Sequence, residues 1–307
     1  MMEFYMKTVK DTELKKIEKF REGCWINVEN ITEEEIEKIK SEFEIDNEWI
    51  QGCIDVNEKP RVEKKGDNVL IITRIPFIDD DGDITTSPFG IIITKNFIMT
   101  ISSFSNTLIE DIKKEKNIAT TQRVRFVLKT FEKINLDFSK YLHLVRNKYE
   151  TIEDQVAKSL TNDEINVLLK IQKTLIYFSS AIVGNEIVFE KINSGKIFKM
   201  YEEDKDIIED IMLSNKEIYE TIKILRDVLS NTLDAYASIV SNNLNIVMKF
   251  LTSMSIILSF SVLIASFYGM NVSLPFQQDP LAFLYIVLFS ILSFIVLYIF
   301  FKRKNWL

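Results

Sequence analysis

Small and polar side chains recur at a helical interval between Asp227 and Ser266. Alternating steps of four and three residues place nearly all of them on one line, a repeat of about 3.5 residues per turn. When several copies of a helix wrap around each other, such a line faces a common axis. Inside a bilayer, its polar groups face protein or water rather than lipid. This polar stripe therefore predicts the lining of a water-filled path. The predicted lining residues are Asp234, Ser238, Ser241, Asn245, Met248, Leu251, Thr252, Ser255, Ser259, Val262 and Ser266, and the line starts at Asp227 and Asn231.

The hydroxyl groups of the polar stripe have a second interpretation. Serine and threonine are common in membrane helices because they allow close packing or bond back to their own backbone. The continuation of the line into Asn245 and Asp234, before the apolar segment begins, favours the pore. Met248 and Leu251 are large and apolar, and a ring of them would close a narrow path by excluding water.

Tyr268-Gly269-Met270-Asn271 follows the stripe directly. Gly269 predicts the end of the helix, since glycine has easy access to positive φ. Asn271 then presents an amide at the mouth of the path. A ring of neutral dipoles suits a strongly hydrated divalent cation such as Mg²⁺, which gives up water reluctantly. Gly269, Met270 and Asn271 are therefore the predicted selectivity motif.

Two apolar segments have to position these groups. Phe250 to Tyr268 and Leu281 to Phe301 contain no charged residue, and each is close to the ~20 residues that cross a bilayer as a helix. Lys249 precedes the first segment and a basic run, 302–304, follows the second, so the positive-inside rule places both ends in the cytoplasm. A buried hairpin in a soluble core is the alternative. The flanking charges favour a multi-pass protein of the plasma membrane.

The stretch from about Asp206 to Gly269 contains no internal glycine or proline, which predicts one long helix shared by the cytoplasmic part and the membrane. One span per chain cannot enclose water, so the path requires an oligomer with the second span facing lipid. The N-terminus lacks the apolar core of a signal peptide.

The first 120 residues predict an α/β domain. Cys24–Val28 reads as a strand, and Thr32 with Glu35 forms a capping-box pattern that opens a helix through Phe43. Two further strands, Asn68–Ile78 and Phe89–Ile101, flank an acidic turn at Asp79–Asp83. The chain then predicts antiparallel helices over Arg123–Leu160 and Asp163–Ile192 and a break at Ser194-Gly195. The predicted organisation is an α/β domain over 1–120, a helical hairpin over 121–205, a long helix over 206–268 with its membrane part from about 248, an external loop over 269–280, a second membrane helix over 281–301 and a basic tail over 302–307.

The charge and composition argue against several other classes of protein. A formal net charge of -7 is unlike a polybasic nucleic-acid binder. One histidine and two cysteines without metal-ligand spacing exclude a multi-histidine zinc site, and Cys24 and Cys53 read as reduced thiols. No P-loop or nucleophile elbow is present, so we expect no enzyme.

The sequence resembles the CorA family of magnesium transporters, whose signature is the YGMN sequence at 268–271. The resemblance extends over 241–249 before the first span and over the basic tail 302–307. It implies a homopentameric, CorA-like funnel lined by the long helices, with Mg²⁺ as transported and regulatory ion. Its pore positions match Asn245, Met248, Leu251 and Asp234. Asp210 looks like an acidic residue of the family's cytoplasmic Mg²⁺-sensing site between subunits.

Acidic clusters supply the other candidates for regulatory metal binding. One lies at the start of the long helix, where Glu202, Glu203, Asp204, Asp206 and Glu209 surround Asp210; the other comprises Asp79, Asp80, Asp81 and Asp83. Carboxylates near a helix N-terminus also interact favourably with the helix dipole, which is the simpler explanation of the first cluster. The functional alternative is that Mg²⁺ bridges neighbouring subunits and holds the pore shut.

The outer loop departs from the family pattern, because Val272–Gln278 carries no charge where many relatives have an acidic segment. Capture of cations would then depend more on Asn271 itself. Relatives that carry zinc or cobalt share this architecture. Two alternatives to Mg²⁺ influx therefore stay open: transport of Co²⁺, Ni²⁺ or Zn²⁺, and a non-conducting membrane-anchored scaffold or sensor.

Overall fold

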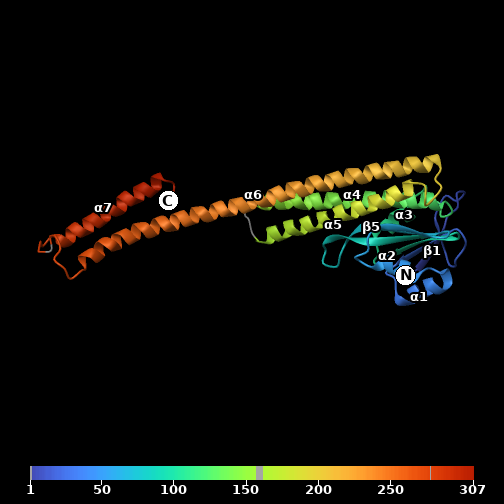
Figure 1. Cartoon of the computed structure of the whole chain (residues 1–307), viewed down its shortest axis with the longest axis horizontal. Helices are drawn as coiled ribbons and strands as arrows, with labels where there is room; N and C mark the ends of the chain where they lie inside the picture. Colours follow the sequence, from blue (N-terminus) through green and yellow to red (C-terminus); the bar gives the residue numbers. More distant parts are fainter. Residues whose placement is uncertain (1, 157–161, 277) are drawn as a thin grey trace. The chain divides into compact units, whose positions relative to one another are not determined.

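A computed structural model describes residues 2–156, 162–276 and 278–307. The chain divides into two compact units, Met1–Leu229 and Ser230–Leu307. The elements in chain order, coloured from blue to red in Figure 1, are β1 (Met2–Met6), β2 (Lys15–Ile17), β3 (Cys24–Glu29), α1 (Glu33–Phe43), α2 (Asn47–Ile54), β4 (Arg61–Lys65), β5 (Asn68–Ile78), β6 (Ile84–Ile93), β7 (Phe97–Ser102), α3 (Thr107–Lys113), α4 (Arg123–Val156), α5 (Asn162–Asn193), α6 (Glu202–Tyr268) and α7 (Ala282–Arg303).

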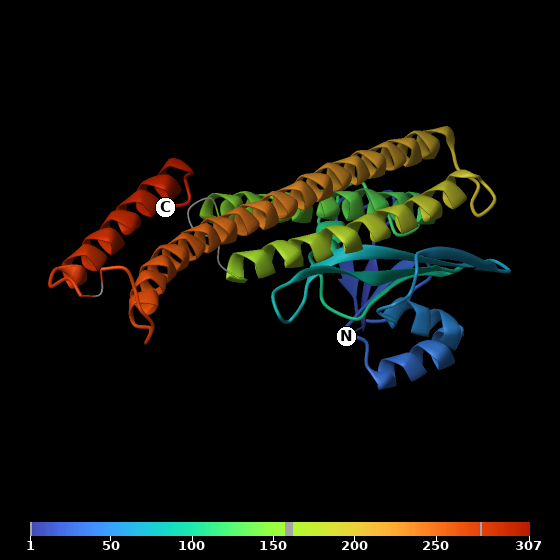
Figure 2. The ribbon, with the colours of Figure 1, turned by 60° about the vertical axis from the view of Figure 1, so that its left-hand side comes forward.

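The first unit is built on one sheet in the order β2-β1-β3-β7-β6-β5-β4. All neighbouring strands are antiparallel except β3 and β7, which run parallel. Figures 1 and 2 show α1 and α2 on one face of the sheet and α4 and α5 on the other. Because both faces are covered, the central strands are almost continuously apolar, as in the run Val69–Ile72 of β5. The α/β prediction for this part of the chain is confirmed.

Local sequence signals predicted several boundaries correctly. Thr32 caps α1, its side chain accepting the N–H of Glu35 at 3.3 Å while the Glu35 carboxylate accepts the N–H of Thr32 at 3.2 Å. The acidic turn after β5 is closed by the Asp79 N–H donating to the Asp83 carbonyl at 3.0 Å, with Gly82 at φ 77°. These capping and turn bonds involve residues at most four apart, so the sequence alone carries them.

The prediction of a single strand over Phe89–Ile101 is wrong. The segment contains the end of β6, which begins earlier at Ile84, and most of β7. The two strands are separated by a turn in which the Thr94 hydroxyl accepts the backbone N–H groups of Asn96 and Phe97 at 3.1 and 3.0 Å. A threonine that bonds its own backbone reverses the chain within a run of β-formers, where neither glycine nor proline marks the turn.

Helix α2 lies so close to the sheet that glycine is required beneath it. A Cβ atom added to Gly90 on β6 would lie 2.7 Å from the Cβ of Cys53 on α2 and would also overlap its sulfur. Cys53 and Cys24 are both fully buried and carry free thiols. Burial raises the pKa of the Cys53 thiol to about 12 and also raises that of Cys24.

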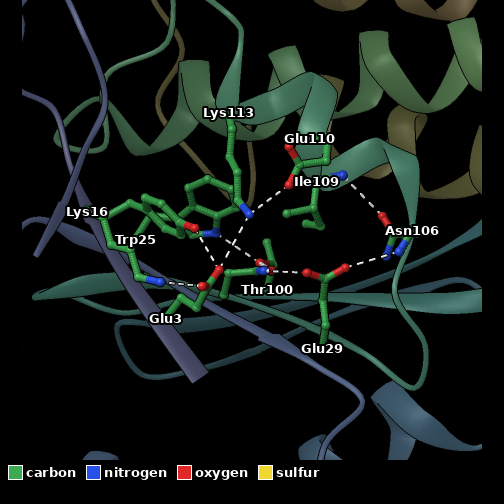
Figure 3. Close-up of polar contacts among 11 residues, drawn as sticks. Glu3, Lys16, Trp25, Glu29, Thr100, Asn106, Ile109, Glu110 and Lys113 are labelled. Carbon is green, nitrogen blue, oxygen red and sulfur yellow. Dashed lines mark hydrogen bonds and ion pairs between the residues drawn. The ribbon is translucent and has the colours of Figure 1, made fainter. Parts of the chain in front are cut away.

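Polar contacts join the first strands of the sheet to α3 (Figure 3). The Glu3 carboxylate accepts from Lys16 at 2.5 Å, from the Tyr5 hydroxyl at 2.6 Å and from Lys113 of α3 at 3.4 Å. These donors lower the pKa of Glu3 to about 2, the Lys16 hydrogen bond having the largest effect.

A second chain of hydrogen bonds in the same view runs through the buried face. The Trp25 indole donates to the Thr100 hydroxyl at 2.9 Å, and that hydroxyl donates to Asn27 at 2.8 Å. The Asn27 amide donates to Glu29 at 3.0 Å, and Glu29 accepts the N–H of Asn106, the N-cap of α3, at 3.1 Å. The network thereby fixes the start of α3 against β3 and β7.

The region after α3 is helical, as predicted, but the helix boundaries differ from the predicted ones. Helix α4 begins at Arg123 as predicted, but residues 157–160 of the predicted helix lie outside the described part of the chain. Its ring pairs with α5 are Phe131–Phe189, with centroids 4.7 Å apart, and Phe138–Phe178 at 5.2 Å. The chain breaks at Ser194-Gly195, where Gly195 adopts φ 72°.

Helix α6 begins at Glu202, four residues before the predicted start, and continues without interruption to Tyr268. Its first turn is attached to α4 because Arg125 contacts Glu203 at 2.7 Å and the buried Asp204 at 3.0 Å. Both carboxylates raise the pKa of Arg125. This long-range pairing explains the early start, which a search for the first apolar repeat does not reveal.

The second unit contains the C-terminal part of α6, a loop and α7, which runs back from the loop in the direction opposite to α6 (Figure 1). Within the described residues, three helices are long and apolar enough to cross a membrane: Asp163–Asn193, Glu202–Tyr268 and Ala282–Arg303. Within the most apolar 18 residues of these helices, 39%, 11% and 0% of the residues, respectively, are buried. The first of the three is tied to the sheet, since Asn185 exchanges two hydrogen bonds with the backbone of Arg74. The other two, α6 and α7, contain the two segments that the sequence predicts to span a membrane.

Candidate functional site: the polar stripe of helix α6

Every member of the polar stripe is exposed in the single chain. This holds from Asp227 to Ser266, including Met248 at 53% and Val262 at 64%. By contrast, the same helix buries Ser253, Ile257 and Ile264. At about 100° per residue, the predicted lining positions in the membrane segment lie about 120° to 180° around the helix from Ile257. The stripe therefore occupies the face opposite the one that the chain covers itself.

A surface groove follows this face. It has a volume of about 640 Å³ and is lined by Met248, Leu251, Thr252, Ser255, Ile256, Ser259, Phe260 and Leu263. Three of these residues supply hydroxyl groups, and the two predicted gate residues, Met248 and Leu251, lie at one end of the set. The structure thus brings five of the predicted lining residues to one continuous surface.

The hydrogen bonds of the hydroxyl groups separate the stripe from the rest of the helix. Off the stripe, the Ser253 hydroxyl donates to the Lys249 carbonyl at 2.7 Å and that of Ser261 donates to the Ile257 carbonyl at 3.3 Å. Among the residues that the structure describes, the hydroxyls of Thr252, Ser255 and Ser259 make no hydrogen bond. Backbone bonding therefore accounts for the serines beside the stripe, while the stripe hydroxyls keep their hydrogen-bonding capacity for water, ions or another copy of the chain.

The predicted selectivity motif comes directly after the helix. Gly269 still donates to the Ala265 and Ser266 carbonyls, each at 3.1 Å, and Met270 donates to Phe267 at 3.4 Å. Gly269 is not among the four described glycines with positive φ, so the expectation that positive φ ends the helix here is wrong. A Cβ at this position would lie 3.5 Å or more from its nearest neighbours. Nothing in the described part of the chain thus requires glycine at 269, and Met270 and Asn271 are exposed after it.

The loop after the motif closes onto the start of α7. The Tyr268 hydroxyl donates to the Pro275 carbonyl at 3.4 Å, and Phe276 adopts φ 64°. Asp279, the only charged residue of the loop, accepts the N–H of Leu281 at 2.8 Å. Its carboxylate therefore serves the first turn of α7, and Asn271 and Ser273 are the exposed polar residues that follow the end of α6.

The two acidic candidate sites have different surroundings. Asp79 accepts the N–H groups of Asp81 and Asp83 at 3.1 and 2.8 Å, and Asp83 pairs with Lys170 of α5 at 2.9 Å. These bonds build a turn, and Asp80 and Asp81 remain exposed at its tip. Across the described part of the chain, no group of three or more His, Cys, Asp or Glu residues is arranged to hold a metal ion.

Asp210 is exposed and borders a cavity of about 280 Å³ between α4 and α6. The same cavity is lined by Glu132, Ser214 and the fully buried Asn135. The Asn135 amide donates to the Ile211 carbonyl at 2.9 Å, whereas its side-chain oxygen has no partner. No sequence pattern singles out Asn135, because one asparagine on an amphipathic helix has no special meaning until its partner helix is known.

Comparisons with known proteins find similarity over most of the chain. The family model described as CorA-like Mg2+ transporter protein matches residues 21–303. The chain is 26% identical to the cobalt/magnesium transport protein CorA of Methanocaldococcus jannaschii over 293 residues, which cover 92% of this chain and 91% of that protein. It is 23% identical to the protein of the same name from Thermotoga maritima over 313 residues, covering 97% and 88%.

The fold agrees over the same length. The complete structure of the CorA magnesium transporter from Methanocaldococcus jannaschii matches with a TM-score of 0.87 and 23% identity, covering 100% of this chain and 99% of that one. The predicted fold class, an α/β domain followed by long helices and two C-terminal apolar helices, is confirmed.

Proposed function

Since the chain belongs to the CorA-like Mg²⁺ transporter family, we propose that it conducts hydrated divalent cations, Mg²⁺ foremost, along the polar stripe of α6. The observation that carries this proposal is the position of the stripe: its residues line the exposed face of α6, opposite the buried Ile257, and form a groove that includes Thr252, Ser255 and Ser259. An exposed line of hydroxyls on a membrane helix has to be covered by protein or water.

Several copies of the chain are required to enclose this path, and the family resemblance supports five. In such a ring, each α6 contributes one stripe to the wall and each α7, which consists almost entirely of apolar residues, faces the lipid. The hydroxyls would contact the water shell of the ion. Met248 and Leu251 would form the narrow apolar ring that closes the path by excluding water.

Selection of the cation is assigned to the end of α6. The exposed amide of Asn271 lies next to the last turn, where a ring of amide and backbone oxygens would hold the hydration shell of Mg²⁺. Outer-shell contact suits an ion that dehydrates reluctantly. Because the loop from 272 to 278 carries no charge, capture of the ion depends on these dipoles rather than on a long-range field.

Lys249 and the basic run 302–304 support a topology with both chain ends on the cytoplasmic side of the plasma membrane and the loop 269–280 outside. Influx then follows the membrane potential. Cytoplasmic Mg²⁺ would act as regulator through acidic residues, of which Asp210 has the best supporting geometry, because it borders a cavity with an unpartnered asparagine oxygen.

A divalent cation other than Mg²⁺ is the first alternative for the transported ion. The relatives from Methanocaldococcus jannaschii and Thermotoga maritima are both named as cobalt/magnesium transport proteins. Co²⁺ is therefore the first competitor, followed by Ni²⁺ and Zn²⁺. A non-conducting anchor is the other alternative, and the unbonded hydroxyls of the stripe argue against it.

The test is flux into liposomes that contain the purified full chain. Uptake of Mg²⁺, Co²⁺, Ni²⁺ and Zn²⁺ is compared for the parent, for Asn271→Ala and for Gln278→Ala. The last variant removes an amide from the same loop and serves as the matched control. We expect Asn271→Ala to reduce Mg²⁺ uptake at least about tenfold, the order of one lost hydrogen-bonding group per subunit, while Gln278→Ala stays at the parent rate.

Assembly is measured in parallel by the mass of the detergent-solubilised complex, which should be the same for all three proteins. Equal uptake by the parent and Asn271→Ala would show that this amide does not select the ion. A parent chain that carries none of the four cations would overturn the transport proposal as a whole.

A further inference from the structure

The chain beyond the last membrane helix is folded into a defined cap. Arg303 is the last residue of α7, and Asn305 adopts a left-handed conformation with φ 55°. The Trp306 N–H donates to the Phe301 carbonyl at 3.1 Å, and the Asn305 N–H donates to the Lys302 carbonyl at 3.2 Å. These two bonds are the 6→1 and 5→2 pair of a Schellman motif. We call residues 301–306 the α7 cap.

The apolar contact that accompanies this motif is also present. The Trp306 ring stacks on the Phe301 ring with centroids 5.6 Å apart and an interplanar angle of 28°. Phe301 is buried to 7% exposure, the value of a core residue, although most of α7 is exposed. The indole is thereby folded back along the helix, so its position relative to the preceding basic residues is fixed.

The polar side of the α7 cap is strongly basic. Lys302, Arg303 and Lys304 are consecutive and exposed, and the Lys302 ammonium lies 5.8 Å from the centroid of the Tyr298 ring. None of the three makes an ion pair within the part of the chain that the structure describes. Lys249 precedes Tyr268, the last residue of α6, by 19 residues, which is close to the 22-residue length of α7, so the two oppositely directed helices bring it to about the depth of the cap.

No acidic side chain balances this charge. In the second unit, the acidic residues are Asp234 and Asp279. Asp279 caps the opposite end of α7, and Asp234 precedes Lys249 by 15 residues, or about 22 Å along a helix at about 1.5 Å per residue. The α7 cap and Lys249 thus carry four basic side chains, and the second unit has no acidic side chain near them in sequence.

The length of α7 places these charges at the membrane surface. Its 22 residues span about 33 Å, close to the ~30 Å of the hydrocarbon core. Tryptophan and tyrosine prefer the interface, and clusters of basic residues next to a span attract anionic headgroups. We propose that the α7 cap, together with Lys249, binds the phosphate of an anionic phospholipid of the cytoplasmic leaflet. This inference rests on the proposed function only in that α7 spans the membrane.

The chain provides its own probe for the test. Of its three tryptophans, Trp25 and Trp49 are buried in the α/β layer, and Trp306 is 37% exposed. Full-length protein in mixed micelles is titrated with brominated phosphatidylglycerol and, separately, with brominated phosphatidylcholine, and the quenching of tryptophan fluorescence is recorded. We expect half-maximal quenching at a phosphatidylglycerol concentration about tenfold lower than the phosphatidylcholine concentration that is needed. We expect W306F to lose the quenching.

Two pairs of variants distinguish lipid binding at the α7 cap from a general effect of positive charge. K302Q/R303Q/K304Q should remove the preference for phosphatidylglycerol, whereas K10Q/K19Q/K114Q, the same charge change on exposed lysines of the α/β layer, should keep it. N305V keeps every charge but disfavours the left-handed residue, so it should weaken the preference, whereas N305G should retain it.

Equal quenching by both lipids in the parent, or an unchanged preference in the triple cap variant, would overturn the proposal. Glycerol phosphate added at the lipid concentration distinguishes a membrane lipid from a soluble phosphate: complete loss of the preference would assign the site to the soluble ion instead. The assay does not require transport, so loss of flux with intact lipid preference would count against the proposed function and not against this site.

Discussion

Some polar side chains on and after α6 make hydrogen bonds within the chain, whereas others leave their polar groups unbonded. Ser253 and Ser261 bond to their own helix, whereas Ser255 and Ser259, at neighbouring positions, keep their hydroxyls unbonded on the exposed face. Asp279 caps a helix, and Asn271 stands exposed. The difference lies in which side of α6 or its end each residue occupies, rather than in the residue type.

Asp210 is the acidic residue for which a regulatory effect is best testable. Asp210→Ala should weaken the inhibition of uptake by Mg²⁺ inside the liposomes, because a bridging carboxylate is lost. The inhibitory concentration should rise several-fold, while uptake at low internal Mg²⁺ stays unchanged. Glu220→Ala, an exposed carboxylate further along α6, is the control. Identical inhibition curves for all three proteins would exclude Asp210 from regulation.

Glu3 gives the α/β domain a defined response to acid. Its pKa is lowered from 4.5 to about 2, first through the Lys16 hydrogen bond, so the folded state holds the carboxylate charged where the unfolded chain would protonate it. Its contribution is complete above pH 4.5 and is lost as the pH falls toward 2. After allowance for solvent screening, we expect about 1 kcal/mol or less.

The measurement is denaturant unfolding of the full chain between pH 6 and pH 2.5 in neutral detergent. Glu3→Gln should be less stable than the parent at pH 6, and the difference should shrink toward pH 2.5. Lys16→Gln is the matched partner and should show the same trend. A difference that stays constant with pH would contradict the assigned role of the carboxylate.

Close contacts between secondary-structure elements determine where the chain needs glycine. Helix α2 approaches β6 so closely that Gly90 has no room for a side chain, whereas Gly269 at the end of α6 is not constrained by its own chain. The first glycine serves the packing of the α/β layer. The second is free of any requirement within one chain, which is consistent with a requirement imposed by neighbouring copies.

Gly90→Ala should destabilise the first unit by about 3 kcal/mol, since the added methyl overlaps Cys53. Cys53→Ala should restore part of that loss when combined with it, because the sulfur is removed while the Cβ contact at 2.7 Å remains. The free energy of unfolding of both single variants and the double variant measures this coupling. A Gly90→Ala protein as stable as the parent would show that α2 moves away without cost.

Ser259→Leu should reduce cation flux at least about tenfold, because a leucine in the groove narrows the path and removes water from it. Ser290→Leu makes the same substitution on α7, the proposed lipid-facing span, and should leave the flux unchanged. Liposome uptake of Mg²⁺ compares the two. Similar rates for both variants would indicate that the stripe does not face the path.

In the assembly that we propose, one chain supplies only one wall of the path. Among the described residues, no group of three or more His, Cys, Asp or Glu is arranged to hold a metal ion, and the stripe is exposed in the single chain. The proposed path therefore requires a ring of copies. The energy for uptake then comes from the membrane, since two positive charges moving inward gain about 4.6 kcal/mol per 100 mV.

Accumulation of Mg²⁺ in the liposomes should therefore follow an imposed inside-negative potential, with a tenfold change in equilibrium ratio for about every 30 mV. A potassium gradient with valinomycin sets the potential, and liposomes with Asn271→Ala protein provide the baseline. Uptake that does not respond to the potential would argue for electroneutral exchange.

Features fixed by neighbouring residues were predictable from the sequence, and those created by distant contacts were not. The capping box of Thr32 and the acidic turn at Asp79 depend on residues at most four apart. The early start of α6 depends on Arg125, which is 79 residues from Asp204, and the buried, unpartnered oxygen of Asn135 depends on the hydrogen bond of its amide to Ile211. The polar stripe was predictable because a continuous helix preserves sequence spacing as position.

The burial of both native cysteines makes the chain suitable for chemical labelling. Cys24 and Cys53 are completely enclosed and their thiols stay protonated at neutral pH, so alkylating and methanethiosulfonate reagents have no native target while the fold is intact. A cysteine introduced at any stripe position would then be the single reactive thiol in each subunit. Side-chain accessibility along α6 can thereby be mapped position by position in the natural sequence background, without first removing any residue.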